Sequence, residues 1–216
     1  MKPPILEIPS LSPYEKPYRI TFEKLEASPE YRALSKGSLR EFEELYLKIQ
    51  EKPKKHIQTL KQLFHKCPGV PEIANLLTYA LLKSKKRKAA EQLIKLTFEI
   101  HPAHLTARIN YADQLIRLGK KEKVPEVIPL RKLLQERESF HYAEFRGLMV
   151  VMGFYYLESG EKEKAEECYE LAFQVDPLHP SVTALEKKIS KRFLLRRGFK
   201  ALLTFLKIRR LTLCLF

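Results

Sequence analysis

Three observations on this 216-residue sequence predict an all-α fold. Only seven glycines occur, 44% of the residues are hydrophobic, and no stretch shows the apolar–polar alternation of half-buried strands. Apolar residues recur instead at the spacing of amphipathic helices. Related residues also return at intervals of about 34 positions, which indicates a repeated structural unit.

The clearest repeat lies between Met149 and Pro177. It contains, in order, Met149-x-x-Met152-Gly153-x-x-Tyr156, Ala165-x-x-x-Tyr169, Ala172 and Pro177. This order and spacing resembles the tetratricopeptide repeat (TPR), whose unit carries W-x-x-L-G-x-x-Y, A-x-x-x-F and a closing Pro. The resemblance implies helical hairpins in which small residues let two helices approach closely. It also implies a short right-handed superhelical solenoid, since one hairpin cannot bury its own apolar face.

Pro177 sets the register of four frames: 37–70, 71–104, 105–138 and 146–179. Frames one and two end in Pro68 and Pro102 at the same position, whereas frame three has Glu136 there. The position where the two helices touch holds, in order, Glu44, Thr78, Ala112 and Gly153. Frame one is therefore degenerate, and the sequence predicts three to four hairpins.

The third frame departs from the pattern in its second helix. Pro125 fits the first turn of that helix, where a missing N–H is tolerated, but Pro129 falls inside it. We expect Pro129 to kink the helix or delay its start. Residues 139–145 then interrupt the tandem spacing, which predicts a longer or displaced second helix and a local change of superhelical pitch.

The segment 1–36 is predicted to be extended and rich in proline. Six of the 14 prolines fall within its first 29 residues, which prevents a helix there. Interspersed apolar residues make it too hydrophobic for a plain disordered tail. Two interpretations remain open: it packs along the outside of the solenoid, or it occupies the concave groove until a partner displaces it.

The C-terminal region is predicted to contain a capping helix at 180–197 and a basic amphipathic tail at 198–216. One face of the predicted capping helix carries Val182, Leu185, Ile189 and Phe193, as in the helix that shields the last repeat in the family. In the tail, a polar stripe of Lys200, Thr204, Lys207 and Arg210 faces apolar residues, and Arg209 falls on the apolar side. Three cations near its centre exclude a spanning helix. The tail either lies in an anionic membrane interface, packs back on the solenoid or makes an oligomer contact, or binds nucleic acid.

Charge is unevenly placed along the chain, whose net charge is +14. Residues 187–216 contain ten basic residues and no acid, whereas residues 1–186 hold the other 30 basic residues and all 26 acids. The turns inside the first three hairpins are also basic, namely Lys52, Lys54 and Lys55; Lys83, Lys85, Lys86, Arg87 and Lys88; and Lys120, Lys121 and Lys123. These cations would form a rim that either attracts acidic partners or simply keeps the protein soluble.

The family resemblance also implies a binding surface, because the first helix of each repeat lines the concave groove in TPR proteins. The corresponding residues here are Asn75, Tyr79, Leu82, Ile109, Asn110, Asp113, Ile116, Val150, Phe154 and Leu157. Asn75 and Tyr79 stand where carboxylate-clamping relatives need Lys and Asn, which disfavours a chaperone-tail receptor. A peptide or amphipathic helix anchored by apolar side chains fits better. The alternative is that some of these residues belong to the core between repeats.

Motifs for catalysis are lacking in the sequence. It has no Gly-rich phosphate loop, no G-x-S-x-G and no H-E-x-x-H, and its six histidines fall near helix ends and loops. The cysteines Cys67, Cys168 and Cys214 lack metal-ligand spacing and suit a reducing cytoplasm. We therefore expect no enzyme activity, no metal and no cofactor.

The sequence thus predicts a cytoplasmic, non-catalytic adaptor that binds a protein or peptide in the TPR groove. One alternative is a peripheral membrane scaffold tethered by the basic tail, and another is a TPR-type secretion chaperone. Nucleic acid is disfavoured because aromatic residues are not interleaved with the cations. The partner and the oligomeric state stay open.

Overall fold

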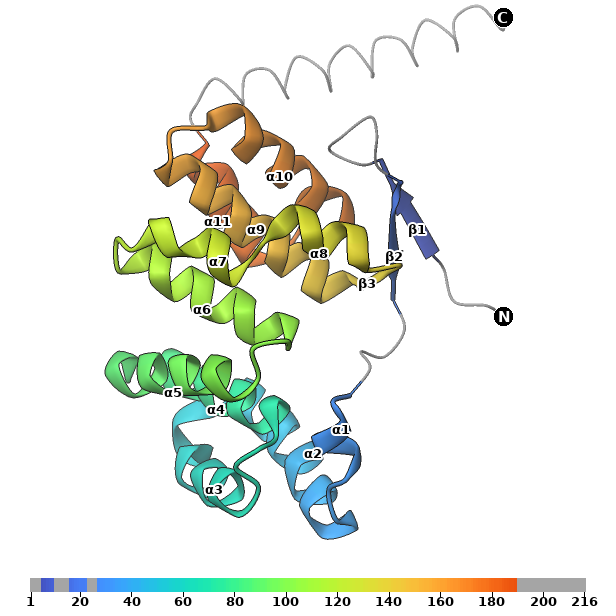
Figure 1. Ribbon diagram of the computed structural model, residues 1–216. Helices are drawn as coiled ribbons and strands as arrows, with labels where there is room; N and C mark the ends of the chain where they lie inside the picture. Colours follow the sequence, from blue (N-terminus) through green and yellow to red (C-terminus); the bar gives the residue numbers. More distant parts are fainter. Residues whose placement is uncertain (1–4, 10–15, 23–26, 190–216) are drawn as a thin grey trace, which may run out of the picture.

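The computed structural model describes residues 5–9, 16–22 and 27–189, which form a mainly helical protein (Figure 1). The helices are α1 Pro29–Arg32, α2 Lys36–Glu51, α3 Pro53–Lys66, α4 Pro71–Lys83, α5 Arg87–Ile100, α6 Leu105–Arg117, α7 Val124–Val127, α8 Leu130–Glu136, α9 Tyr142–Glu158, α10 Lys162–Val175 and α11 Pro180–Lys188. A 3₁₀ turn at Lys121–Lys123 precedes α7, and three short strands occur, β1 Ile5–Ile8, β2 Tyr18–Thr21 and β3 Phe140–His141.

Helix pairs follow the predicted frames closely. The pairs α2–α3, α4–α5 and α9–α10 each form an antiparallel hairpin, and the first helices α4, α6 and α9 lie beside the hairpins that precede them. Proline marks five of the described helix starts, in the first turns of α1, α3, α4, α7 and α11 (Pro29, Pro53, Pro71, Pro125 and Pro180). Each of these hairpins coincides with one of the frames to within a few residues.

Equivalent turns join the helices of three hairpins. Lys85, Gly119 and Gly160 occupy the same position in their frames, and all three have positive φ, between 60° and 82°. After each of them, the next residue donates its N–H to the carbonyl five positions earlier, as in Lys86 to Leu81. This is the Schellman end of a helix. The first hairpin lacks it, because Pro53 begins α3 directly after Lys52.

Gly153 lies at a close contact between helices, as the repeat pattern predicts. A Cβ atom at this position would lie 2.6 Å from Leu185 Cδ2 and 3.5 Å from Cys168 Cβ. Helices α9, α10 and α11 therefore pack closely around a position that only glycine fits without displacing a neighbour. Leu185 and Val182 are fully buried on one face of α11, and Ile189, which directly follows the helix, is also buried. The predicted cap is helical up to Lys188, and Phe193 lies outside the described residues.

The third hairpin has a broken second helix. Helix α7 ends at Val127, and α8 begins at Leu130 after Ile128 and Pro129 leave the helical conformation. Proline lacks an N–H and its ring clashes with the preceding turn, so Pro129 stops one helix and precedes the next. The predicted disturbance at Pro129 is confirmed, but the second helix is divided into two short pieces and is not longer.

An all-α fold is too simple a description, because the N-terminal segment forms a small sheet. Strands β1 and β2 pair antiparallel, with Ile5 opposite Thr21, and β2 pairs parallel with β3, with Ile20 opposite Phe140. The prolines lie outside the paired residues, which leaves the intervening apolar residues free to form strands. The interruption at 139–145 supplies β3 and the first turn of α9.

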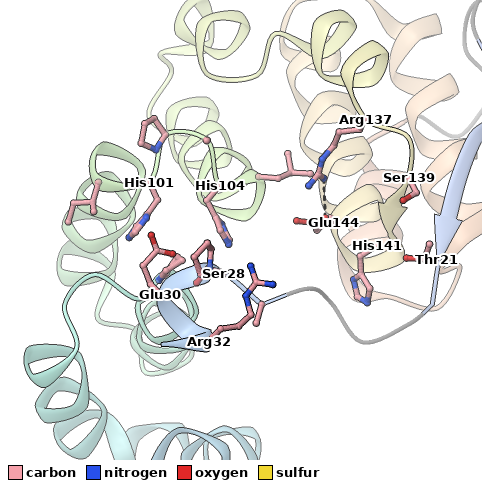
Figure 2. A pocket seen from close by; sticks show the side chains of 17 residues that line it. Thr21, Ser28, Glu30, Arg32, His101, His104, Arg137, Ser139, His141 and Glu144 are labelled. Carbon is pink, nitrogen blue, oxygen red and sulfur yellow. Dashed lines mark hydrogen bonds and ion pairs between the residues drawn. The ribbon is translucent and has the colours of Figure 1, made fainter. Parts of the chain in front are cut away.

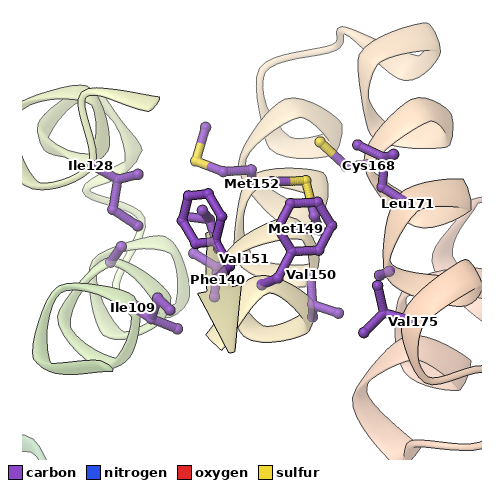
Figure 3. Packing of buried hydrophobic residues seen from close by; sticks show 14 of the residues in the cluster. Ile109, Ile128, Phe140, Met149, Val150, Val151, Met152, Cys168, Leu171 and Val175 are labelled. Carbon is purple, nitrogen blue, oxygen red and sulfur yellow. The ribbon is translucent and has the colours of Figure 1, made fainter. Parts of the chain in front are cut away.

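The hydrophobic core is divided into two clusters. The N-terminal cluster is formed by helices α2 to α5, and its fully buried members include Ile49, Leu60 and Ile73. The C-terminal cluster is formed by α6 to α11 together with buried residues of all three strands. In Figure 3, α9 residues such as Met149 and Met152 lie between Ile109 and Ile128 on one side and α10 on the other.

Candidate functional site

The first helices of successive hairpins lie side by side and present polar groups to one another. Asn110 of α6 donates a hydrogen bond of 3.2 Å from Nδ2 to Oδ1 of Asn75 on α4. Tyr79 of α4 donates a hydrogen bond of 3.3 Å to Gln50 Oε1 on α2, and Lys83 Nζ lies 5.5 Å from the centre of the Tyr79 ring. These contacts join α2, α4 and α6 into one surface, which we call the first-helix face.

The predicted groove residues differ in their exposure. Leu82 is exposed, and the half-buried residues are Asn75, Tyr79, Asn110, Asp113, Ile116, Phe154 and Leu157. Asp113 forms an ion pair with Arg117 on the same helix, with 2.9 Å between Asp113 Oδ2 and Arg117 Nε. Ile116, Phe154 and Leu157 pack against the C-terminal cluster, and Tyr79 packs against the N-terminal one. The accessible part of the predicted set therefore centres on α4 and α6.

Two predicted groove residues are corrected from surface to core. Ile109 is 8% exposed and Val150 is 5% exposed, and both belong to the C-terminal cluster. Helices α6 and α9 approach so closely that a Cβ atom on Gly147 would lie 3.5 Å from Ile109 Cγ2. Side chains between the two helices are therefore buried in their interface, which is the alternative left open for part of the set.

A second concave site was not predicted from the sequence. This junction pocket, of about 670 Å³, lies where the N-terminal segment crosses the turns between hairpins (Figure 2). Its polar lining includes Thr21, Ser28, Glu30, Arg32, His101, His104, Arg137, Ser139, His141 and Glu144. Arg137 and Glu144 form an ion pair of 3.1 Å on one side of the pocket (Figure 2). Both signs of charge and three imidazoles therefore line one space.

Ser28 attaches the N-terminal segment to this pocket. Its backbone N–H and its hydroxyl donate hydrogen bonds of 2.7 and 2.8 Å to the two carboxylate oxygens of Glu72 on α4. The same hydroxyl accepts a hydrogen bond of 3.1 Å from the N–H of Tyr31 and caps α1. Farther along, the rings of Tyr18 and Phe145 lie 5.3 Å apart. The described part of the segment thus runs past the starts of α4 and α9, along the edge of the molecule.

Three histidines cap helices at or near this edge. The Nδ1 atoms of His104, His141 and His179 accept hydrogen bonds from N–H groups at the starts of α6, α9 and α11, at 3.4, 3.3 and 3.2 Å. An acceptor Nδ1 requires an imidazole without a proton on that atom. Burial lowers the pKa of His104, and burial together with Arg146 lowers the pKa of His179. The neutral form that caps a helix is therefore favoured.

Among the described residues, the buried cysteine Cys168 and possible clusters of metal ligands form no further site. Burial raises the pKa of the Cys168 thiol to about 12, which keeps it protonated and unreactive at neutral pH. In the part of the chain that the structure describes, no group of three or more His, Cys, Asp or Glu side chains could hold a metal ion. Within residues 5–9, 16–22 and 27–189, no helix is both long and apolar enough to cross a membrane.

The basic turns lie within the described residues, whereas the tail does not. Lys85, Lys120 and Lys123 are exposed at the turns within hairpins, at the ends of α4 and α6 opposite to the junction pocket. The tail residues Lys200, Lys207, Arg209 and Arg210 lie outside the described residues. Their predicted contact with a membrane or with the helical body therefore stays a prediction.

Comparison with known proteins gives little beyond a remote structural likeness. No protein-family model matches the chain, and no curated protein is significantly similar to it. Solved structures that match include one described as a MamA RS-1 ArsTM double mutant, which is 15% identical. The match covers 78% of this chain and 99% of that chain, with a TM-score of 0.49. Similarity at this level assigns neither a family nor a function.

Proposed function

We propose that the chain is a non-catalytic protein-binding module that holds an extended peptide or an amphipathic helix on its first-helix face. The observation that carries this proposal is the set of accessible side chains shared by α4 and α6. Asn75 and Asn110 are joined across the two helices, and Tyr79 and Leu82 continue along α4. An adaptor of this kind acts by recognition alone.

The chemistry of this face suits a peptide backbone with an apolar anchor. Each amide of the Asn75–Asn110 pair keeps donor and acceptor capacity beyond their mutual bond, which can serve the N–H and C=O groups of an extended peptide. Leu82 offers an exposed apolar contact on the same helix. Tyr79 combines an apolar ring with a hydroxyl and is restrained by Gln50 and Lys83, which lowers the entropy lost on binding.

The test begins with peptides selected from a displayed random library against the full chain. Their affinities are then measured for the chain and for Tyr79→Ala and Leu82→Asp, with circular dichroism to verify the fold. Because a few central side chains dominate most interfaces, each substitution is expected to weaken binding by about tenfold or more.

Leu178→Asp provides the matched control, since Leu178 is exposed and lies in the turn between α10 and α11. It should leave the affinity unchanged. Selected peptides that bind Leu82→Asp as well as they bind the unchanged chain would contradict the proposal. A steep fall in affinity with salt would instead indicate that the basic turns or the tail are the binding surface.

A further inference from the structure

The broken second helix of the third hairpin leaves an open cleft beside α9. Helices α3 and α5 pack along the first helices that follow them, α4 and α6, but α7 and α8 make little backbone contact with α9. A cleft of about 530 Å³ lies between these elements. We call it the proline cleft, and its lining residues are Pro125, Ile128, Pro129, Leu130, Arg131, Lys132, Gln135, Met152, Tyr155, Tyr156, Glu161 and Lys164.

The inner part of the proline cleft is apolar. Ile128 and Met152 are buried at its base, and Pro129, Leu130 and Tyr155 form half-buried walls. The rings of Tyr155 and Tyr156 lie 5.2 Å apart and tilted by 57°, so they present an aromatic surface rather than a single ring. The volume lies within the range of roughly 300–1,000 Å³ that is typical of ligand pockets. The base therefore suits a large apolar side chain.

Cations dominate the rim of the cleft. Arg131, Lys132 and Lys164 are exposed there, against a single acid, Glu161, which pairs with Lys164. Lys164 also lies over the Tyr156 ring, with its Nζ atom 5.4 Å from the ring centre. Lys132 is 3.7 Å from Glu136, and Arg131 forms no ion pair with another described residue. The rim thus has an excess of positive charge around an apolar base.

We propose that the proline cleft is a second protein-binding surface, which accepts an aromatic side chain of a partner flanked by acidic residues. The aromatic ring would lie against Tyr155 and Pro129, where stacked or edge contacts are available. The flanking carboxylates would lie near Arg131 and Lys132, where the charges are complementary. The cleft shares no residue with the first-helix face, so substitutions can test the two proposed binding surfaces separately.

The chain contains no tryptophan, which gives this proposal a direct optical test. The probe is the blocked peptide acetyl-Glu-Glu-Trp-Glu-Glu-amide, titrated with the full chain while tryptophan anisotropy and emission wavelength are recorded. Binding in the cleft should raise the anisotropy and shift the emission to the blue, because the indole leaves water. Probes with Lys in place of Glu, or with Ala in place of Trp and used as a competitor, should not bind.

Charge reversals locate the site without disturbing the core. Arg131→Glu combined with Lys132→Glu should weaken probe binding by about tenfold, since both side chains are exposed at the rim. Lys85→Glu combined with Lys86→Glu makes the same change of net charge at the turn between α4 and α5 and should have little effect. Equal losses in the two variants would mean diffuse attraction to a basic protein and would overturn the proposal.

Three further arms separate the remaining outcomes. Tyr155→Ala should abolish the blue shift, and if that variant unfolds, the charge reversals alone decide the result. The first-helix variant Leu82→Asp should bind the probe normally, which distinguishes this surface from the proposed adaptor face. A single-stranded oligothymidine of ten nucleotides tests whether the cleft binds nucleic acid instead. If it binds with the same dependence on Arg131 and Lys132 while the acidic peptide does not, the cleft is no protein site.

Discussion

The two hydrophobic clusters are built in different ways from the same kind of helix hairpin. In the N-terminal cluster, α2 to α5 are unbroken, and each packs directly on the next helix of the chain. In the C-terminal cluster, α7 and α8 are short, and residues 139–145 separate them from the body of α9. Ile8, Tyr18 and Ile20, from the other end of the sequence, are buried there beside Phe140 and Phe145.

This difference shows that where the repeat is interrupted, residues from a distant part of the sequence complete the hydrophobic core. The inserted residues supply β3, which pairs with β2, and the aromatic side chains on either side of that pairing complete the core. Helices that follow the regular spacing need no such addition. The C-terminal half should therefore depend on strands β1 and β2, and the N-terminal cluster, which contains no strand residue, should not.

The largest effect is expected from Phe145→Ala. Phe145 is fully buried and contacts the rings of Tyr18 and Phe140, so its removal leaves a cavity where β2, β3 and α9 meet. The free energy of unfolding should fall by about 3–5 kcal/mol in urea titrations followed by circular dichroism. A loss below about 1 kcal/mol would mean that the strands contribute little to this core.

A smaller effect is expected from Ile20→Ala, which tests the N-terminal segment itself. Ile20 is fully buried and lies opposite Phe140 in the parallel pairing. Its truncation should cost about 2–3 kcal/mol, measured by thermal and urea unfolding. The neighbouring exposed residue gives the control, and Arg19→Ala should change stability by no more than about 0.5 kcal/mol.

The repeated turns allow substitutions of opposite sign in the two halves. Gly160 has φ of 82°, so Gly160→Ala should destabilise the C-terminal half by about 1 kcal/mol. Lys85 holds φ of 60° at the equivalent turn, and Lys85→Gly should stabilise the chain by up to about 1 kcal/mol. Gly69→Ala is the control, because its backbone is not left-handed and its Cβ would meet no neighbour. Effects of equal sign at both turns would contradict the common geometry.

The smallest effect concerns pH and the histidine caps. The folded pKa values of His104 and His179 lie below the ordinary value of 6.5, because burial, the larger influence, outweighs the nearby carboxylates. The folded state then binds fewer protons than the unfolded state, so this stability is complete above pH 6.5 and falls as the pH decreases below it. We therefore expect the free energy of unfolding to fall as the pH is lowered from 7.5 to 5.

The double variant His104→Asn and His179→Asn isolates this contribution. Asparagine keeps a side-chain acceptor for the helix N–H groups but does not titrate. Its unfolding free energy should vary less with pH than that of the unchanged chain, as thermal melts across this range would show. Identical pH profiles for the two proteins would mean that the caps do not control the acid dependence.

Much of the helical framework is predictable because its signals are local. Pro53 and Pro71 start helices, Gly119 and Gly160 end them, and Pro129 breaks one, each through its own backbone chemistry. Gly153 is predictable from the repeat spacing, which identifies the contact between helices.

The sheet and the pockets depend on distant residues, and local patterns do not reveal them. The pairing of Ile20 with Phe140 joins segments 120 residues apart, and β3 is only two residues long. Ile109 shares a helix face with surface residues, and its burial follows from the approach of Gly147 on another helix. Histidine is not among the usual capping residues, so His104 and His141 gave no helix-start signal.

The dependence of one half on the N-terminal segment is tested most directly by hydrogen exchange, measured by mass spectrometry, on Ile20→Ala. The account predicts faster exchange in β3, α6 and α9, while α2, α3 and α4 keep the protection of the unchanged chain. Leu60→Ala, at a fully buried position of the N-terminal cluster, should give the reverse pattern. Uniform loss of protection across all helices in both variants, or unchanged exchange in α9 of Ile20→Ala, would contradict it.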